Sequence, residues 1–390
     1  MTRIGIVVQP DFLVQHVGVR NYLFTLYQYL SLGADVRFVS FFRPQRQLRH
    51  WFYVHLQDPA FLRNNGVTED WRIEGAPAAV LDRYHATAGD QADRQPALWT
   101  SHIGSCLESA GFDTLVFGNP WLVEFADRLP VKRQVGIVYD AIPNRYVLTE
   151  AEKPYEFAAQ HVAGFRYFRE HCDRTLAISE SVTDDLTRLL HFPPERVGFL
   201  PPMVPTDCLA TPTGAAPRRT GAVVLASPLD RRKGLEQMPR LIAAAGRRVD
   251  RVTMYGAVRC SPDQLKAFFR GLPSRLSLEW YPRATGRTTE RLFREGRMLL
   301  FPSLNEGLGL PLIEAQVRGC PVVTRDARPM SDLVVAGSRV LTDDPAADDE
   351  VVRQLAGDAA FDHATFEAAA RAFFRTDDLP ARVLRAIAEG

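Results

Sequence analysis

The stretch "FPSLNEGLGLPLIEAQVRGCPVV", residues 301–323, predicts a strand, a glycine turn and a helix in close succession. Pro311 suits the first turn of a helix, because its missing N–H would have no partner there. Gly319 is placed to end that helix, and Pro321 prevents its continuation. A helix that starts after a glycine turn offers free backbone N–H groups and a positive dipole end, so the stretch predicts an anion site.

Two carboxylates, Glu306 and Glu314, border this predicted anion site. They would repel a bare phosphate, but they suit a ligand with hydroxyls on both sides of its phosphates. A nucleotide sugar has that order, with ribose, pyrophosphate and sugar. Dinucleotide binding fits less well, because Leu312 stands where the third glycine of G-x-G-x-x-G belongs. The plain alternative is that both glutamates are surface residues at a helix end.

Short apolar runs alternate with amphipathic stretches along most of the chain, which predicts an α/β fold with parallel, doubly wound sheets. The alternation is interrupted at residues 200–221, "LPPMVPTDCLATPTGAAPRRTG", which hold five prolines and show no periodicity. The alternation resumes after it, so we expect two Rossmann-like domains facing across a cleft. The predicted division is an N-terminal domain over 1–205, a linker over 206–220, a second domain over 221–370, and a C-terminal helix in 371–390 that returns to the first domain.

Composition narrows the class of protein. The 390 residues are 46% hydrophobic and 24% charged, with a formal net charge of +1, which argues against a nucleic-acid-binding protein. Five scattered cysteines without metal-ligand spacing indicate reduced thiols, so we expect a cytoplasmic protein. The acidic run 343–350 is interpreted as a solvated surface segment rather than a metal site, and no metal or other cofactor is expected.

The segment from Arg43 to about Trp99 departs from the alternation and mixes basic and aromatic residues. A lid, an acceptor surface and a patch that touches an anionic membrane all fit this composition. We favour an insertion packed by its own aromatic residues.

The E-x7-E pattern of Glu306 and Glu314 resembles the donor-site signature of retaining glycosyltransferases with the GT-B fold, of the large family 4 type. Further segments resemble the same family in order, so that most of the chain is covered except roughly 43–110 and the last forty residues. These segments are "VGVRNYLFTLYQYL" (17–30), "IVYDAIPNRY" (137–146), "RTLAISESVTDDLTRLLHFPPERVGFLPP" (174–202) and "VLASPLDRRKGLEQMPRLI" (224–242).

The resemblance implies a role for each matching residue. Glu306 would lie beside the hydroxyls of the donor sugar, and Glu314 would accept from the ribose hydroxyls. Lys233 and Arg232 would neutralise the diphosphate and the charge that develops on the leaving group. The backbone amides around Gly307, Leu308, Gly309 and Leu310 would receive the sugar and diphosphate, and Gly18 would let the first domain's helix approach the phosphates. On spacing alone, a solvated turn explains Arg232 and Lys233 better.

Two positions depart from the family pattern. Ser227 stands where many relatives carry an arginine, so one phosphate contact is missing or comes from another arginine such as Arg20. Tyr139 stands where many relatives carry histidine, before Asp140. On the acceptor side, Tyr139, Asp140 and Arg20 are the candidates, and a structural role for Asp140 is an equal alternative.

The family implies transfer of a hexose or deoxyhexose, with retention, from a nucleotide diphosphate sugar to a glycan or a lipid-linked acceptor in bacterial polysaccharide or lipopolysaccharide synthesis. Front-side attack in that scheme needs no protein nucleophile, and the chain's lack of D-x-D fits a metal-independent enzyme. A lipid-linked acceptor would bring the protein to the inner face of the membrane. One rival is a starch-synthase-like enzyme or phosphorylase, and another is a non-catalytic sugar-binding domain. Donor base, sugar, acceptor and oligomeric state are not specified by the sequence.

Overall fold

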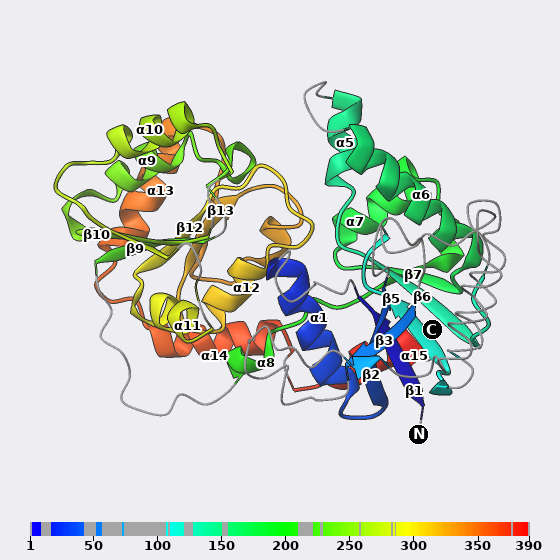
Figure 1. The fold of residues 1–390 in the computed structure, drawn as a ribbon. Coiled ribbons are helices and arrows are strands. Elements are labelled where there is room, and N and C mark those ends of the chain that lie inside the picture. The colour runs from blue at the N-terminus through cyan, green and yellow to red at the C-terminus, as the bar shows by residue number, and fades with distance from the viewer. Residues whose placement is uncertain are drawn as a thin grey trace. The chain divides into compact units, whose positions relative to one another are not determined.

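The computed structural model divides into two compact units, unit 1 with residues Met1–Met203 and Asp378–Gly390, and unit 2 with residues Val204–Asp377 (Figure 1). It describes residues 2–8, 17–42, 52–56, 72–73, 107, 110–120, 128–149, 155–209, 221–226, 229–256, 259–281, 284, 286–375 and 377–388.

Unit 1 is built on a sheet that has eight strands in the described part of the chain. Its order is β4-β3-β2-β1-β5-β6-β7-β8, in which the pairs β2–β3 and β3–β4 are antiparallel and the other pairs are parallel. The parallel strands are rich in apolar residues because helices cover both faces. The strands are β1 (Arg3–Val7), β2 (Asp35–Phe42), β3 (Phe52–Leu56), β4 (Arg72–Ile73), β5 (Thr114–Phe117), β6 (Arg133–Val138), β7 (Arg174–Ala177) and β8 (Val197–Phe199).

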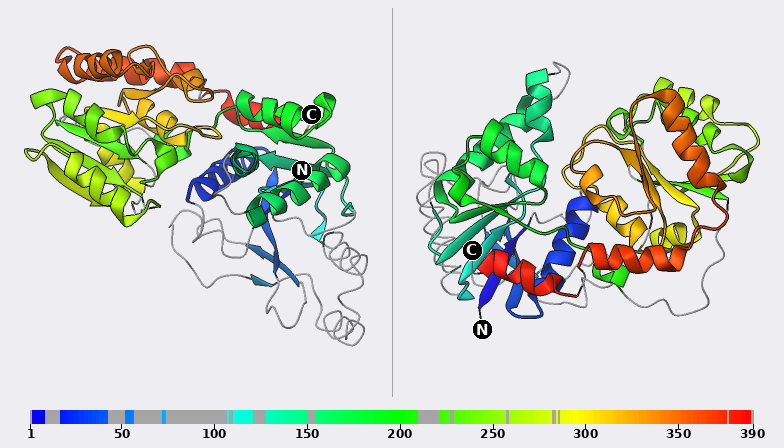
Figure 2. Two further views of the ribbon diagram at one scale, coloured as in Figure 1. Left: turned by 90° about the horizontal axis from the view of Figure 1, so that it is seen from above. Right: turned by 180° about the vertical axis from the view of Figure 1, so that it is seen from behind.

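The helices of unit 1 include one from the far end of the chain. Helix α15 packs on α1, where a Cβ on Gly33 would stand 2.6 Å from Leu384, and Figure 2 shows the red α15 beside the blue α1. The described helices are α1 (Val17–Leu30), α5 (Ile142–Thr149), α6 (Tyr155–His171), α7 (Glu180–Asp184), which continues as a π turn over Asp185–Leu189, and α15 (Leu379–Ala388).

Unit 2 is built on a parallel sheet of six strands, among the residues described, in the order β11-β10-β9-β12-β13-β14. The chain winds outward from β9 in one direction and from β12 in the other. The topological switch point therefore lies between β9 and β12, where ligands bind in doubly wound sheets. The strands are β9 (Ala222–Ala226), β10 (Arg251–Tyr255), β11 (Ser277–Tyr281), β12 (Met298–Phe301), β13 (Val322–Arg325) and β14 (Arg339–Leu341).

Two layers of helices cover this sheet, with α9, α10 and α13 on one face and α11, α12 and α14 on the other (Figure 1). The described helices are α8 (Thr206–Leu209), α9 (Met238–Ala244), α10 (Pro262–Gly271), α11 (Gly286–Glu295), α12 (Leu310–Gln316), α13 (Pro345–Gly357) and α14 (His363–Phe373). Helix α8 lies within the predicted linker, and α14 runs through the predicted boundary at residue 370.

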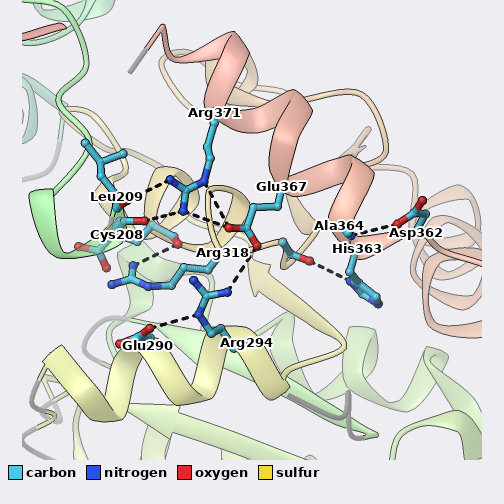
Figure 3. Close-up of polar contacts among 12 residues, drawn as sticks. Cys208, Leu209, Glu290, Arg294, Arg318, Asp362, His363, Ala364, Glu367 and Arg371 are labelled. Carbon is cyan, nitrogen blue, oxygen red and sulfur yellow. Dashed lines mark hydrogen bonds and ion pairs between the residues drawn. The ribbon is translucent and has the colours of Figure 1, made fainter. Parts of the chain in front are cut away.

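Arg371 joins the beginning of unit 2 to its end (Figure 3). Its guanidinium donates to the carbonyl oxygens of Cys208, at 3.0 Å, and Leu209, at 3.3 Å, and pairs with Glu367 at 3.0 Å. Glu367 also pairs with Arg294 at 3.4 Å. This network fixes α8 and α14 to α11, so the segments by which the chain enters and leaves unit 2 are held together inside it.

The α/β fold predicted from the alternation is confirmed. The N-cap of α7 is Ser179, which accepts from Val182 N at 3.3 Å. One local prediction is wrong. The acidic run 343–350 is not wholly solvated, since Asp348 is buried and accepts from Thr342 N at 2.7 Å.

The irregular segment after Arg43 adds only the short strands β3 and β4 to the described part of the sheet. The rest of this segment lies outside the described residues. The choice between a lid, a membrane patch and an insertion therefore stays a prediction. In the part of the chain that the structure covers, no helix is both long and apolar enough to cross a membrane.

We expect His161 on α6 to make the stability of unit 1 depend on pH. The side chain is 3% exposed, and burial lowers its pKa from the ordinary 6.5 to about 4. Because the folded state excludes the proton, we expect the free energy of unfolding to fall as the pH drops from 6.5 towards 4, by about 3 kcal/mol. Denaturant titrations at successive pH values should show this loss, and His161→Phe should remove it. The exposed His191, replaced by asparagine, is the control and should leave the loss in place.

Candidate functional site

The loop after β9 packs directly on the end of β12, at the switch point. It forms a 3-10 turn, Arg231–Lys233, whose first N–H groups are capped by Asp230, since its side chain accepts from Arg232 N at 2.9 Å. Gly234 follows with φ +79°, and a Cβ there would stand 2.2 Å from Pro302 O. Only glycine permits both this backbone conformation and this approach.

That approach brings the predicted cations to the first glutamate. Lys233 Nζ donates to Glu306 Oε1, and Arg232 Nη1 lies 3.5 Å from Glu306 Oε2 and also donates to Asn305 O. The side chains of Lys233, Glu306 and Arg232 are 9%, 10% and 19% exposed. The solvated-turn interpretation of Arg232 and Lys233 is therefore wrong, because the fold buries the turn against β12. Two cations meet one carboxylate, which leaves one positive charge for an anionic ligand.

The charges of this cluster decide its protonation. Burial disfavours ionisation of Glu306, but the charges of Lys233 and Arg232 outweigh it and lower the pKa of this carboxyl. Burial also lowers the pKa of Lys233, against the opposing charge of Glu306. Glu306 is thus a carboxylate at neutral pH and can accept hydrogen bonds from hydroxyl groups.

The glycine turn leads into α12 as the sequence predicts. Gly309 caps the helix with φ +98°, a left-handed conformation that favours glycine, and the helix begins at Leu310. Leu308 is buried at 4% exposed and anchors the turn, while Gly307 precedes it. Glu314 lies one turn into α12 and is half-buried.

Gln316 fixes α12 in place. It is fully buried, donates to the carbonyl oxygens of Leu312 and Leu333 at 3.0 and 2.8 Å, and accepts from Val335 N at 2.8 Å. A buried amide with its hydrogen bonds made holds one orientation, because an unmade bond there costs free energy. Sequence reasoning missed Gln316, and it missed Asp230 and Gly234, although Asp before a turn and Gly after it are recognisable capping signals.

The remaining predicted residues belong to unit 1. Gly18 is exposed in the first turn of α1, and a Cβ there would meet no described atom within 4 Å. Two residues on, burial lowers the pKa of Arg20. Tyr139 follows β6 and meets the Tyr22 ring edge-on, with the ring centroids 5.2 Å apart. Asp140 accepts from Ile142 N at 3.0 Å, which is the structural role considered for it.

Ser227 lies outside the described residues. The substitution of serine for the family's arginine therefore stays a sequence-level observation.

Comparison with known proteins agrees with this geometry. Residues 222–358, which hold β9 to α13 of unit 2, match the family "Glycosyl transferases group 1". No curated protein is similar enough in sequence to count as a match. The predicted family and enzyme class, a glycosyltransferase, are confirmed for this segment of unit 2.

Solved structures share the fold. Anabaena Alr3699/HepE, in complex with UDP-glucose, superimposes with a TM-score of 0.63 at 14% identity, over 100% of this chain and 99% of that one. WaaG, a glycosyltransferase involved in lipopolysaccharide biosynthesis, gives 0.61 at 16% identity, over 99% and 100%. S. aureus TarM gives 0.54 at 14% identity, over 74% of this chain and 57% of its own length, so the chain spans little more than half of TarM. These likenesses confirm the predicted GT-B fold.

The Lys233–Glu306 pair should stabilise unit 2 only as a pair. At neutral pH, Lys233→Met leaves a buried carboxylate with Arg232 alone, so we expect the free energy of unfolding to fall by roughly 3 kcal/mol. The double variant Lys233→Met/Glu306→Gln should lose less than the two single variants together. Because the pKa of Glu306 is lowered, the contribution is present above pH 4.5 and disappears at more acidic pH. Denaturation midpoints of the wild type, the two single variants and the double variant measure these losses of stability. A double variant that loses as much as the two single variants together would contradict the coupling.

Tyr22 and Tyr139 should tolerate loss of their hydroxyls. Both hydroxyl oxygens are buried and have no hydrogen-bond partner in the described part of the chain. Tyr139→Phe and Tyr22→Phe are therefore expected to keep or raise the free energy of unfolding, by up to about 1 kcal/mol. Tyr167→Phe is the matched control and should lose stability, because Tyr167 Oη donates to Gln134 Oε1 at 2.8 Å. A loss with Tyr139→Phe as large as the control's would mean that its hydroxyl has a structural partner.

Proposed function

We propose that the chain transfers a hexose or deoxyhexose, with retention at the anomeric carbon, from a nucleotide diphosphate sugar to a hydroxyl group of a glycan or lipid-linked acceptor. The observation that carries this proposal is the buried cluster of Arg232, Lys233 and Glu306 at the switch point of unit 2. The cluster combines an excess of positive charge, which can bind the diphosphate, with a carboxylate, which can accept hydrogen bonds from the sugar hydroxyls.

Each residue of the cluster has a part in the proposed reaction. Hydroxyls of the donor sugar would donate to Glu306, whose carboxylate now accepts from Lys233. The diphosphate would then take Lys233 and Arg232 as its counter-charges. As the bond from the anomeric carbon to the phosphate oxygen breaks, these cations stabilise the negative charge on the leaving diphosphate. Glu314 and the turn Gly307–Leu310 would hold the ribose and the phosphates.

Retention follows from attack on the face from which the diphosphate departs. The acceptor oxygen bonds to the anomeric carbon, and its proton passes to the departing phosphate oxygen, so no protein nucleophile is required. Because Glu306 is engaged by two cations, it suits binding better than the nucleophilic role known from retaining hydrolases. Since the same two cations supply the charge for the leaving group, the proposed reaction is metal-independent.

The acceptor would be bound by unit 1, with Tyr139, Asp140 and Arg20 as the proposed contacts. WaaG acts in lipopolysaccharide biosynthesis, and TarM was solved with fondaparinux, α-GlcNAc-glycerol and UDP. By analogy, the acceptor here is a glycan or lipid-linked saccharide in polysaccharide synthesis. The enzyme would work in the cytoplasm, and a lipid-linked acceptor would bring it to the inner face of the membrane.

A donor screen by release of nucleoside diphosphate, with EDTA present, tests the proposal. The wild type should turn over one class of nucleotide sugar. Lys233→Met should reduce kcat by about 100-fold or more, because it removes a charge that acts on the leaving group. Glu306→Gln should reduce kcat/KM for the donor.

The exposed carboxylate Glu350, which pairs with Arg353 on α13, provides the matched control. Glu350→Gln should retain wild-type rates, and thermal unfolding should show that every variant is folded at the assay temperature. Turnover that EDTA abolishes would contradict the metal-independent reaction. Binding of a nucleotide sugar without turnover, with every acceptor offered, would favour the non-catalytic alternative.

A further inference from the structure

The negative charge of Glu306 is stabilised mainly by its two cations. In the described part of the chain, Oε1 accepts from Lys233 Nζ, and Oε2 lies 3.5 Å from Arg232 Nη1. The side chain of Glu306 is only 10% exposed, so water hydrates little of it. A carboxylate buried in this way is costly to leave without its cations, because solvent does not replace them.

Two further polar side chains lie at this cluster, and neither replaces a cation. The Ser303 hydroxyl helps to lower the pKa of Glu306, but its Oγ also lies 3.3 Å from Arg232 O. A hydroxyl has a single hydrogen to donate. Asp230 adds a negative charge, and its side chain accepts from Arg232 N at 2.9 Å. An anion that binds at the cluster therefore has to share Lys233 and Arg232 with Glu306.

A bare nucleoside diphosphate meets an opposing charge at this cluster. Its terminal phosphate is not bonded to a sugar, so it ionises further than the same phosphate in a nucleotide sugar. When its oxygens take Lys233 and Arg232, the Glu306 carboxylate gives up its partners and faces a second anion. Like charges repel strongly where little water screens them. The carboxylate therefore lowers the affinity of the cluster for the diphosphate alone.

A nucleotide sugar avoids this conflict. Its hydroxyls can donate to Glu306 in place of Lys233, and its diphosphate carries less negative charge because one terminal oxygen is bonded to the sugar. Each buried charge then keeps a partner, which is the condition for burying charges without a large cost. The same carboxylate thus favours one ligand and opposes the other, and these ligands are the donor and the product of the proposed reaction.

We propose that Glu306 makes the site select a nucleoside diphosphate that still carries its sugar and reject the bare nucleoside diphosphate that the transfer leaves behind. This inference rests on the proposed function, because the proposed reaction supplies both ligands. Once the sugar has left with the acceptor, no hydroxyl donates to Glu306. The carboxylate then competes with the diphosphate for Lys233 and promotes release of the product.

Isothermal titration of the full chain with UDP, GDP, UDP-glucose and GDP-mannose, without acceptor, tests this inference. For whichever base binds, Glu306→Gln should bind the bare nucleoside diphosphate about tenfold more tightly than the wild type, because a neutral amide removes the opposing charge. The same variant should show no gain for the matching nucleotide sugar, because an amide oxygen accepts more weakly from its hydroxyls than a carboxylate does. A misfolded variant would lose affinity for both ligands, so a gain for one of them identifies the charge as the cause.

Glu350→Gln is the matched control, because it removes an exposed carboxylate of unit 2, paired with Arg353, and changes the net charge by the same amount. Its affinities should equal those of the wild type. Unchanged or weaker binding of the bare nucleoside diphosphate by Glu306→Gln, or an equal gain for both ligands, would overturn the inference and leave the proposed function standing. If neither the wild type nor Glu306→Gln bound any of the four ligands, the proposed function would fail, and the inference with it.

Discussion

The close approach of the β9 loop to the end of β12 is the constraint on which the candidate site depends. Gly234 lets the backbone pass where any side chain would strike Pro302 O, and Asp230 caps the turn that precedes it. As a result, Lys233 and Glu306, which are 73 residues apart in sequence, share a hydrogen bond. A bulkier residue at position 234 would open the gap between the loops and separate the charges.

Burial determines how strongly Lys233 and Glu306 interact. A lysine and a glutamate in water contribute little to stability, but a nearly buried pair is costly to break and strongly coupled. Arg232 adds a second cation, so the cluster carries a net positive charge in a place with little solvent. A sugar diphosphate could replace both halves of the ion pair at once, with hydroxyls for Glu306 and phosphates for Lys233. Such an exchange leaves no buried charge without a partner.

The rest of unit 2 holds α12, which carries Glu314, and the turn before it, which carries Glu306, against the sheet. Gln316 fixes the helix through buried amide hydrogen bonds, and Arg318 fixes its last turn against Phe293. The ring contact of Tyr255 with the same phenylalanine adds a strand end to this assembly. The ion pairs around Arg371 keep the entering and leaving segments of the chain attached to α11, and so to the helix layer that contains α12.

Local patterns in the sequence determined the strands and helices, because apolar runs, caps and glycines act within a few residues. The start of α12 and the order of elements followed from them, and the E-x7-E pattern pointed to both glutamates. Spacing alone favoured a solvated turn for Arg232 and Lys233. Only the tertiary structure decided their role, because the sheet order brings the ends of β9 and β12 to one edge and buries the two cations there against Glu306.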